Sequence, residues 1–242
     1  SGAYNTALGS LALDALTTTS NNTAIGYGAM STSTGASDCV LIGANAGADG
    51  DITQTGTIGI GSSALLSLTS GAGNTAIGYQ SLDAEDDGDY NTAVGYQALT
   101  AQTGTSGEVG NTAVGYQSGL AMTSGINNTL MGAWSGDALT TGDYNTAVGL
   151  NALTADDVGD KSSAFGYGAL GSQNIVSAGS TYNTGIGMQT GYYNVTGTNN
   201  TYVGYQAGFG ASGQSNSDNT AVGKSALAAI TDGDSNVVVG LS

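Results

Sequence analysis

Apolar, small and polar residues recur along this chain with a period of about 17 residues. The repeated phrase is Asn-Thr-Ala-(Val/Ile)-Gly-Tyr-Gln, and we call its glycine the hinge glycine. The fourteen hinge glycines are Gly9, Gly26, Gly43, Gly61, Gly78, Gly95, Gly115, Gly132, Gly149, Gly166, Gly187, Gly204, Gly223 and Gly240. The residue directly before each hinge glycine is apolar. The residue three places before the glycine is almost always β-branched. Because alternate residues of a strand share one face, this pattern predicts a short strand before each hinge glycine.

The two sides of this predicted strand differ in composition. We expect the apolar residue before the hinge glycine to point into a core, together with the Thr row two places earlier. The residue between them is mostly Ala, as in Ala76 and Ala93, and is expected to face the other way. An outward, alanine-lined stripe suits the close approach of another chain. Since one coil has a thin core, burial at about 25 cal/mol per Å² barely offsets ordering costs of about 1–2 kcal/mol per residue. We therefore expect an intertwined or side-by-side oligomer, first of all a homotrimer; the alternative is a monomeric solenoid that tolerates Ala on its outside.

The period and the glycines together define the fold class. A helix needs apolar residues three and four apart and is destabilised by regularly spaced glycines. Two short β segments that meet at the hinge glycine fit better, and 17 residues suit one coil of a solenoid. We predict an all-β, parallel β-solenoid (β-roll) of about 14 coils with a ~17-residue repeat, forming one domain over residues 1–242 and packed as a trimer.

In-register stacking places like residues on like residues. The Asn that opens most copies is predicted to form a ladder at a corner of the coil, where Asn tolerates a left-handed backbone conformation. The hinge glycines are predicted to stack in the same way. The clearest members of these two ladders are Asn74, Asn91, Asn111, Gly78, Gly95 and Gly115.

Composition and charge exclude several classes of function. The 242 residues include 42 Gly, no Pro, no His and 18 acidic residues against two Lys, for a net charge of −16. Nucleic acid and anionic membranes bind mainly through Lys and Arg, so neither is expected as a partner. The absence of His removes the commonest general base and metal ligand. The single Cys39 excludes an internal disulfide, and no apolar run is long enough for membrane insertion.

Three of the repeats carry a resemblance to known proteins. The runs Asn74-Thr-Ala-Ile-Gly-Tyr-Gln80, Asn91-Thr-Ala-Val-Gly-Tyr-Gln97 and Asn111-Thr-Ala-Val-Gly-Tyr-Gln117 resemble repeats of phage tail-fibre proteins and related bacterial surface proteins. More loosely, they are similar to the head repeats of trimeric autotransporter adhesins, which are parallel β-rolls of three packed chains. The resemblance implies a trimeric, extracellular, non-enzymatic attachment fibre on a virion tail or a cell surface, with a cell-surface glycan or protein as receptor. The chain stops inside a repeat at Ser242, so we expect a segment of a longer fibre protein.

Aromatic residues are the candidate receptor contacts. Tyr79, Tyr96 and Tyr116 follow hinge glycines and are expected to stack, which is a packing role by default. The alternative is a carbohydrate-binding stripe, because sugar rings stack on aromatic faces. Trp134, the only Trp, lies one position later in its repeat, where a side chain alternates outward. It is the best single candidate for a ligand contact.

Acidic residues gather between the predicted strands, for example Asp86, Asp87 and Asp89. A Ca²⁺ ion takes six to eight oxygen ligands, and these three residues are the candidates if a cation binds. Their spacing matches neither an EF-hand loop nor the nine-residue calcium repeat. Solvated turns that keep a fibre soluble are the simpler interpretation. No other cofactor is expected.

Two alternative functions follow from the same residues. Paired carboxylates would suit a polysaccharide-degrading tail spike, but the acids lie in Gly-rich turns without an accompanying Arg or aromatic cluster. A regular Thr row on a solenoid would suit ice binding. Because that row is expected to share the face of the core Val and Ile, it should point inward, which argues against this alternative.

Overall fold

A computed structural model describes residues 2–104 and 107–241. The chain divides into two compact units, which we describe separately: Ser1–Gln117 with Ala121–Ser124, and Ser118–Leu120 with Gly125–Ser242. Strands and turns make up the described residues, and no helix in them could cross a membrane. Ser242, on which the expectation of a longer protein rests, lies outside the described residues.

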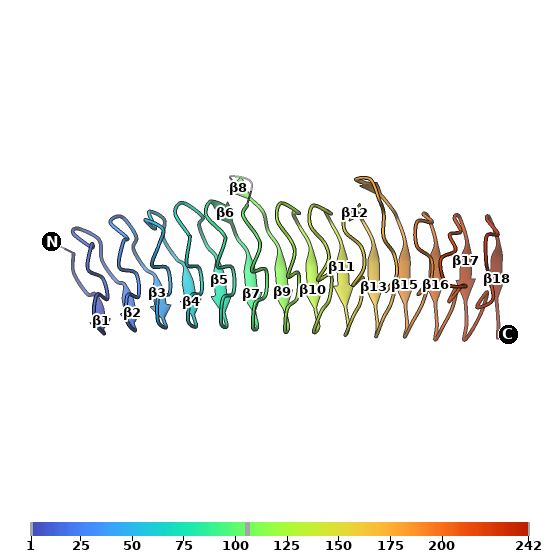
Figure 1. The fold of residues 1–242 in the computed structure, drawn as a ribbon, viewed down its shortest axis with the longest axis horizontal. Helices are drawn as coiled ribbons and strands as arrows, with labels where there is room; N and C mark the ends of the chain where they lie inside the picture. Colours follow the sequence, from blue (N-terminus) through green and yellow to red (C-terminus); the bar gives the residue numbers. More distant parts are fainter. Residues whose placement is uncertain (1, 105–106, 242) are drawn as a thin grey trace. The chain divides into compact units, whose positions relative to one another are not determined.

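Each coil contributes one three-residue strand that ends at the residue before a hinge glycine (Figure 1). In the first unit these are β1 (Thr6–Leu8), β2 (Thr23–Ile25), β3 (Val40–Ile42), β4 (Ile58–Ile60), β5 (Thr75–Ile77), β7 (Thr92–Val94) and β9 (Thr112–Val114). In the second unit they are β10 (Thr129–Met131), β11 (Thr146–Val148), β13 (Ser163–Phe165), β15 (Thr184–Ile186), β16 (Thr201–Val203), β17 (Thr220–Val222) and β18 (Val237–Val239). The predicted all-β fold, a parallel solenoid of about 14 coils, is confirmed.

The pairing register follows the repeat. In the first unit Thr75 pairs with Thr92, and Ile77 pairs with Val94. In the second unit Thr146 pairs with Ser163, and Val148 pairs with Phe165. Equivalent positions of successive coils therefore form straight rows, as the spacing of the hinge glycines predicts.

The prediction of which strand face is buried is wrong. The middle residue of the strand points inward, and in all but the terminal coils it is fully buried, as Ala76 and Ala147 are. The residues on either side of it point outward. Ile77, predicted to lie in the core, is 38% exposed, and Phe165 is 39% exposed. The alanine row therefore lines the interior of the coil and offers no stripe for another chain.

We call the surface formed by the two outward positions of these strands the outer sheet face. It consists of one Thr-rich row and one row of larger apolar residues, none of which is buried. Its members are the first and third residues of β1, β2, β3, β4, β5, β7 and β9 in the first unit, and of β10, β11, β13, β15, β16, β17 and β18 in the second. The premise that the Thr row points inward is therefore also wrong.

The coil interior explains why Ala occupies the middle of the strand. The space is narrow, and a larger residue in this row is matched by a glycine four residues after a hinge glycine, where most coils have Leu or Met. Leu41 lies against Gly47, and a Cβ atom on Gly47 would lie 2.7 Å from a Leu41 methyl group. Tyr202 lies against Gly208 in the same way, with 2.4 Å to the ring. In these coils a larger strand residue is offset by a smaller turn residue, as dense packing requires. The coils of Ala113 and Gly185 also have glycine at the turn position, and in the second of these Gly191 lies against Leu170 and Tyr202 of the neighbouring coils.

The second β segment predicted after the hinge glycine does not form. The chain instead makes a turn in which the second and fourth residues after the hinge glycine have positive φ, such as 51° at Gln80 and 49° at Leu82. The remaining strands are two residues long and lie elsewhere in the coil. They are β6 (Gly88–Asp89), paired with β8 (Gly107–Glu108), and β12 (Gly159–Asp160), paired with β14 (Gly179–Ser180).

Candidate functional site

The Asn that opens most repeats forms a ladder, which is buried in all but the terminal coils. The Asn91 N–H donates to Asn74 Oδ1 at 2.8 Å, and the Asn111 N–H donates to Asn91 Oδ1 at 3.0 Å. The Asn74 Nδ2 also donates to the Gly88 carbonyl at 2.7 Å. Each side-chain amide therefore joins the backbone of its own coil to the backbone of the next.

The left-handed corner expected at Asn lies one residue earlier. Tyr90 has φ 61° and Gly110 has φ 64°, whereas Asn91 and Asn111 do not have positive φ. This earlier residue turns the chain, so that Asn directly precedes the strand with its side chain buried. The ladder follows from burial of the amide, since a buried polar group needs a partner.

Thr57 occupies the Asn position of its coil and allows a stability test. It is buried, and its hydroxyl has no hydrogen-bond partner among the described residues. Thr57→Asn should restore the ladder, because its Oδ1 would accept the Asn74 N–H and its Nδ2 would donate to the Gly71 carbonyl. We expect the free energy of unfolding to rise by about 1 kcal/mol, measured by chemical denaturation. Thr55→Asn, at an exposed neighbouring position, is the control, and equal effects of the two substitutions would contradict the ladder assignment.

The three candidate tyrosines stack in the first unit. The ring centroids of Tyr79 and Tyr96 are 5.1 Å apart, and those of Tyr96 and Tyr116 are 5.4 Å apart. Beside them the side-chain amides of Gln80, Gln97 and Gln117 form a ladder with two bonds of 3.0 Å. Because each face of Tyr96 covers a neighbouring ring, Tyr96 presents its edge and hydroxyl to a ligand. A sugar ring could not stack on it.

Trp134 belongs to the second unit and lies in the position that Gln occupies in other repeats. Its φ is 52°, and the residue is 40% exposed. The left-handed turn directs this large ring outward from the coil. The side chain is therefore accessible, as the alternation along the repeat predicts.

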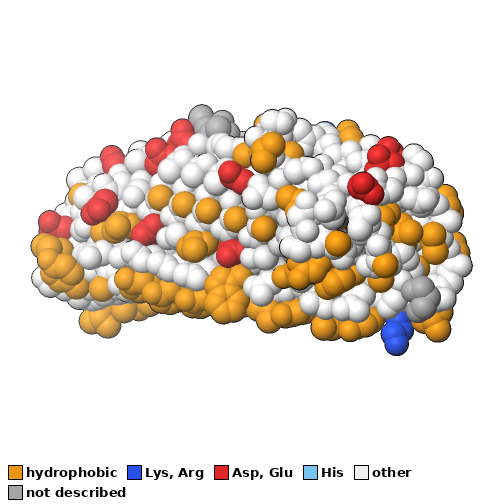
Figure 2. Space-filling view, turned by 45° about the vertical axis from the view of Figure 1, so that its right-hand side comes forward, with side chains coloured by type: hydrophobic (Ala, Val, Ile, Leu, Met, Phe, Trp, Pro, Cys, Tyr) orange, Lys and Arg blue, Asp and Glu red, His pale blue; other side chains and the backbone are white. Residues whose placement is uncertain are grey.

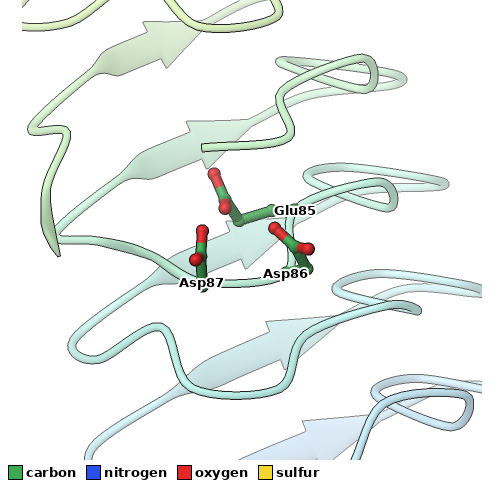
Figure 3. A group of neighbouring side chains, drawn as sticks. All are labelled: Glu85, Asp86 and Asp87. Atoms are coloured by element: carbon green, nitrogen blue, oxygen red, sulfur yellow. The ribbon is translucent and has the colours of Figure 1, made fainter. Parts of the chain in front are cut away.

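Acidic residues come together in one turn, although the set differs from the one predicted. Ligand oxygens of Glu85, Asp86 and Asp87 all lie within 4.8 Å of one another (Figure 3). Asp89 is not part of this group, because its Oδ1 accepts the Ala72 N–H at 2.7 Å. Glu85, which the sequence did not single out, accepts bonds at both oxygens, from the Gly88 N–H at 2.8 Å and from Asn91 Nδ2 at 3.3 Å. These bonds account for Glu85 without a cation.

Asp89 represents a row of acids with a structural role. In the second unit the Ile126 N–H donates to Asp143 Oδ1 at 2.8 Å, and the Asp143 N–H donates to Asp160 Oδ1 at 2.9 Å. Ser217 and Asp234 repeat the arrangement at 2.7 Å. Each acid thus accepts a backbone N–H from the preceding coil. Part of the negative charge of the turns therefore holds neighbouring coils together.

Two acids lie inside the coil, at the position seven residues after a hinge glycine. Glu85 holds this position in the first unit and Asp156 in the second, and both are fully buried. Asp156 Oδ1 accepts the Ile175 N–H at 3.1 Å and the Gly159 N–H at 3.3 Å, while Oδ2 accepts Gln173 Nε2. Some other coils have an apolar residue here, including Leu68 and Leu139, and others have a buried amide, such as Gln102 and Gln173. Because the residue type at this position varies from repeat to repeat, the sequence pattern does not mark it as interior.

Each buried acid lies in the coil before one of the two longest repeats, which run from Gly95 to Gly115 and from Gly166 to Gly187. The coil after Asp156 carries an insertion, and Ile175 in that insertion is one of the residues bonded to the carboxylate. In this insertion the Asp156 carboxylate accepts a backbone N–H, and charged acceptors make the stronger hydrogen bonds. Glu85 instead bonds to Gly88 and Asn91, which precede the following insertion.

Burial raises the pKa of Glu85 and of Asp156, and their backbone and side-chain hydrogen bonds offset part of that rise. The cause is the loss of solvation of the charged form. A raised pKa in the folded state means that the folded chain holds its proton to higher pH than the unfolded chain does. The contribution to stability is therefore fully present below the unfolded pKa and is lost as pH rises through the folded pKa.

Glu85→Gln should separate this effect from general charge repulsion. In the wild type, the free energy of unfolding should fall as pH rises above about 4.3, by up to about 1.4 kcal/mol per pH unit for one group. The variant should lose the Glu85 part of that slope, measured by chemical denaturation between pH 4 and 8. Asp14→Asn removes the same charge at an exposed position of the same unit. If both variants keep the wild-type slope, the assignment to Glu85 is wrong.

Comparison of this chain with protein-family models, with curated proteins and with solved structures finds no match.

Proposed function

We propose that this chain is a segment of a non-enzymatic structural and attachment fibre, exposed outside the cell on a virion tail or a cell surface. It acts as a homotrimer and binds a cell-surface glycan or protein receptor. One observation carries the proposal: the side chains of each coil bond to the next coil in register, through the Asn, Gln and Asp rows. Such a chain builds a repeating stack, which suits an extended support better than a catalytic centre.

The positions of the carboxylates also support a non-enzymatic function. A glycoside hydrolase needs two carboxyl groups on either side of the bond it cleaves, roughly 5–9.5 Å apart. Glu85 and Asp156 lie inside the coil, and Asp89 and Asp143 accept backbone N–H groups. These carboxylates already have structural partners. The polysaccharide-degrading tail spike is therefore the less favoured alternative.

A binding assay with an array of immobilised bacterial surface polysaccharides tests the proposal. We expect the protein to be retained on at least one polysaccharide without releasing new reducing ends. Trp134→Ala should weaken that retention, whereas Tyr144→Ala, which removes another exposed aromatic ring of the same unit, should not. Release of oligosaccharide that disappears when one carboxylate is replaced would overturn the non-enzymatic proposal. Equal loss from both variants would remove Trp134 as the contact.

Ice binding is a second candidate. A Thr row that pointed into the core would argue against it, but this row in fact points outward. The Thr row lies on the outer sheet face and is repeated in register from strand to strand. Regular rows of hydroxyl and methyl groups on a sheet can order water. Thermal hysteresis of the purified protein is the direct measurement. Its absence would remove this candidate.

A further inference from the structure

The outer sheet face differs in chemistry from the rest of the surface. Neither of the two outward positions of any strand that precedes a hinge glycine carries a charged residue. Large apolar side chains remain exposed there, including Ile77 in the first unit and Met131, Phe165 and Ile186 in the second. Exposed apolar surfaces that exceed a few hundred Å² mark interaction sites.

The acidic residues lie elsewhere. All 18 occur outside the strands that precede hinge glycines, and none directly follows a hinge glycine. Figure 2 shows hydrophobic side chains along the lower edge of the view with no acidic side chain among them, whereas other hydrophobic side chains lie among the acidic ones. A second copy of the chain also has a net charge of −16. Two such copies repel each other wherever acids would meet, and the outer sheet face is the surface on which they can approach without that repulsion.

We propose that, within each unit, the outer sheet face is where copies of this chain pack against one another. This inference rests on the proposed homotrimer and replaces the alanine-lined stripe as its contact surface. The rows are straight, because equivalent residues are paired in register along the sheet. A row of Val, Ile, Met or Phe in one copy can therefore lie along a row of another copy over successive coils. The hinge glycines next to this row have no side chains to hold the copies apart.

Val148 offers the sharpest test in the second unit. It lies on β11 between Met131 and Phe165 of the paired strands, and its side chain points outward. Val148→Glu should leave the single chain folded but place like charges against each other wherever copies meet. The matched control is Val176→Glu, at a loop position that is 87% exposed. Val148→Thr, which keeps a β-branched side chain, is the milder second variant if the glutamate prevents folding.

The measurement is mass in solution by sedimentation and light scattering over a range of protein concentrations. Circular dichroism checks that each variant is folded. We expect the wild type and Val176→Glu to have three times the monomer mass of 23.5 kDa. Val148→Glu should raise the concentration at which the assembly dissociates by about tenfold or more, and Val148→Thr should raise it less.

The outcomes separate this inference from the proposed function. A wild-type protein that stays at 23.5 kDa would remove the homotrimer itself. An assembled wild type whose mass withstands both Val148 substitutions would overturn the outer sheet face as the contact and leave the homotrimer standing. A monomer whose thermal hysteresis is abolished by Val148→Glu would assign the same face to ice.

Discussion

Gly95→Ala is expected to destabilise the first unit by about 3 kcal/mol or more. Gly95 has φ 144°, a backbone conformation that is costly for residues with a Cβ atom. A Cβ atom there would also lie 2.2 Å from the carbonyl oxygen of Gly115 in the next coil. The hinge glycines stack backbone on backbone, so the added methyl group would force two coils apart. Chemical denaturation of the purified variant measures the loss.

Two other glycines separate the causes of this effect. Gly213 has φ 77°, but a methyl group added there would have no atom within 4 Å, so Gly213→Ala should cost only about 1–2 kcal/mol. Gly179 has neither a positive φ nor a contact closer than 3.8 Å, and Gly179→Ala should be nearly neutral. Similar losses for all three would show that the contact with the neighbouring hinge glycine is unimportant.

Asn145→Ala is expected to cost about 2–5 kcal/mol in the second unit. The side chain accepts the Ser162 N–H at 2.8 Å and donates to the Gly159 carbonyl at 2.7 Å, and the residue is fully buried. Its removal leaves two buried backbone groups without a partner, each costing about 1–3 kcal/mol. The loss should appear as a lower denaturation midpoint.

A second substitution at the same position tests the two bonds separately. Asn145→Asp keeps the acceptor for Ser162 but turns a carboxylate oxygen toward the Gly159 carbonyl, so it should also destabilise the fold, and more strongly as pH rises. Asn174→Ala, at an exposed loop position, is the control and should change stability by less than about 0.5 kcal/mol. If Asn145→Ala changed stability as little as Asn174→Ala, the role of Asn145 in the ladder would be contradicted.

The period, the strand and the hinge could be predicted from the sequence because each depends on local pattern. A glycine that returns in every repeat, preceded by a β-branched residue, an Ala and an apolar residue, specifies a short strand and its end. In-register stacking then follows from the constant spacing. The Asn ladder follows as well, since a polar residue at a fixed place in each coil must meet its own copy.

The orientation of the strand could not be predicted from alternation alone. Both of its faces are apolar, one with Ala and the other with Val, Ile and Thr, so a period of two does not distinguish inside from outside. The deciding signal is volume, and it is present in the sequence. Leu41 and Tyr202 replace Ala in repeats where Gly47 and Gly208 replace the usual Leu. Only residues that share a closed interior need such compensation.

The acidic residues are a second case in which the sequence does not determine the direction of a side chain. Asp86, Asp87 and Asp89 are close in sequence, but the structure places Asp89 against the backbone of the preceding coil and brings Glu85 to the other two. Which acids meet depends on the direction of each side chain in the turn. Sequence separation does not report that direction.

The hydrogen bonds between coils connect residues one repeat apart, so each junction within a unit is made in nearly the same way. Some repeats are also identical over the strand, as residues 91–97 and 111–117 are. A duplication or deletion of one whole repeat in the gene would therefore keep every junction of this kind. Such a change adds or removes one whole coil and rejoins the Asn and glycine rows without a mismatch. The fold therefore accommodates changes of length in steps of one coil.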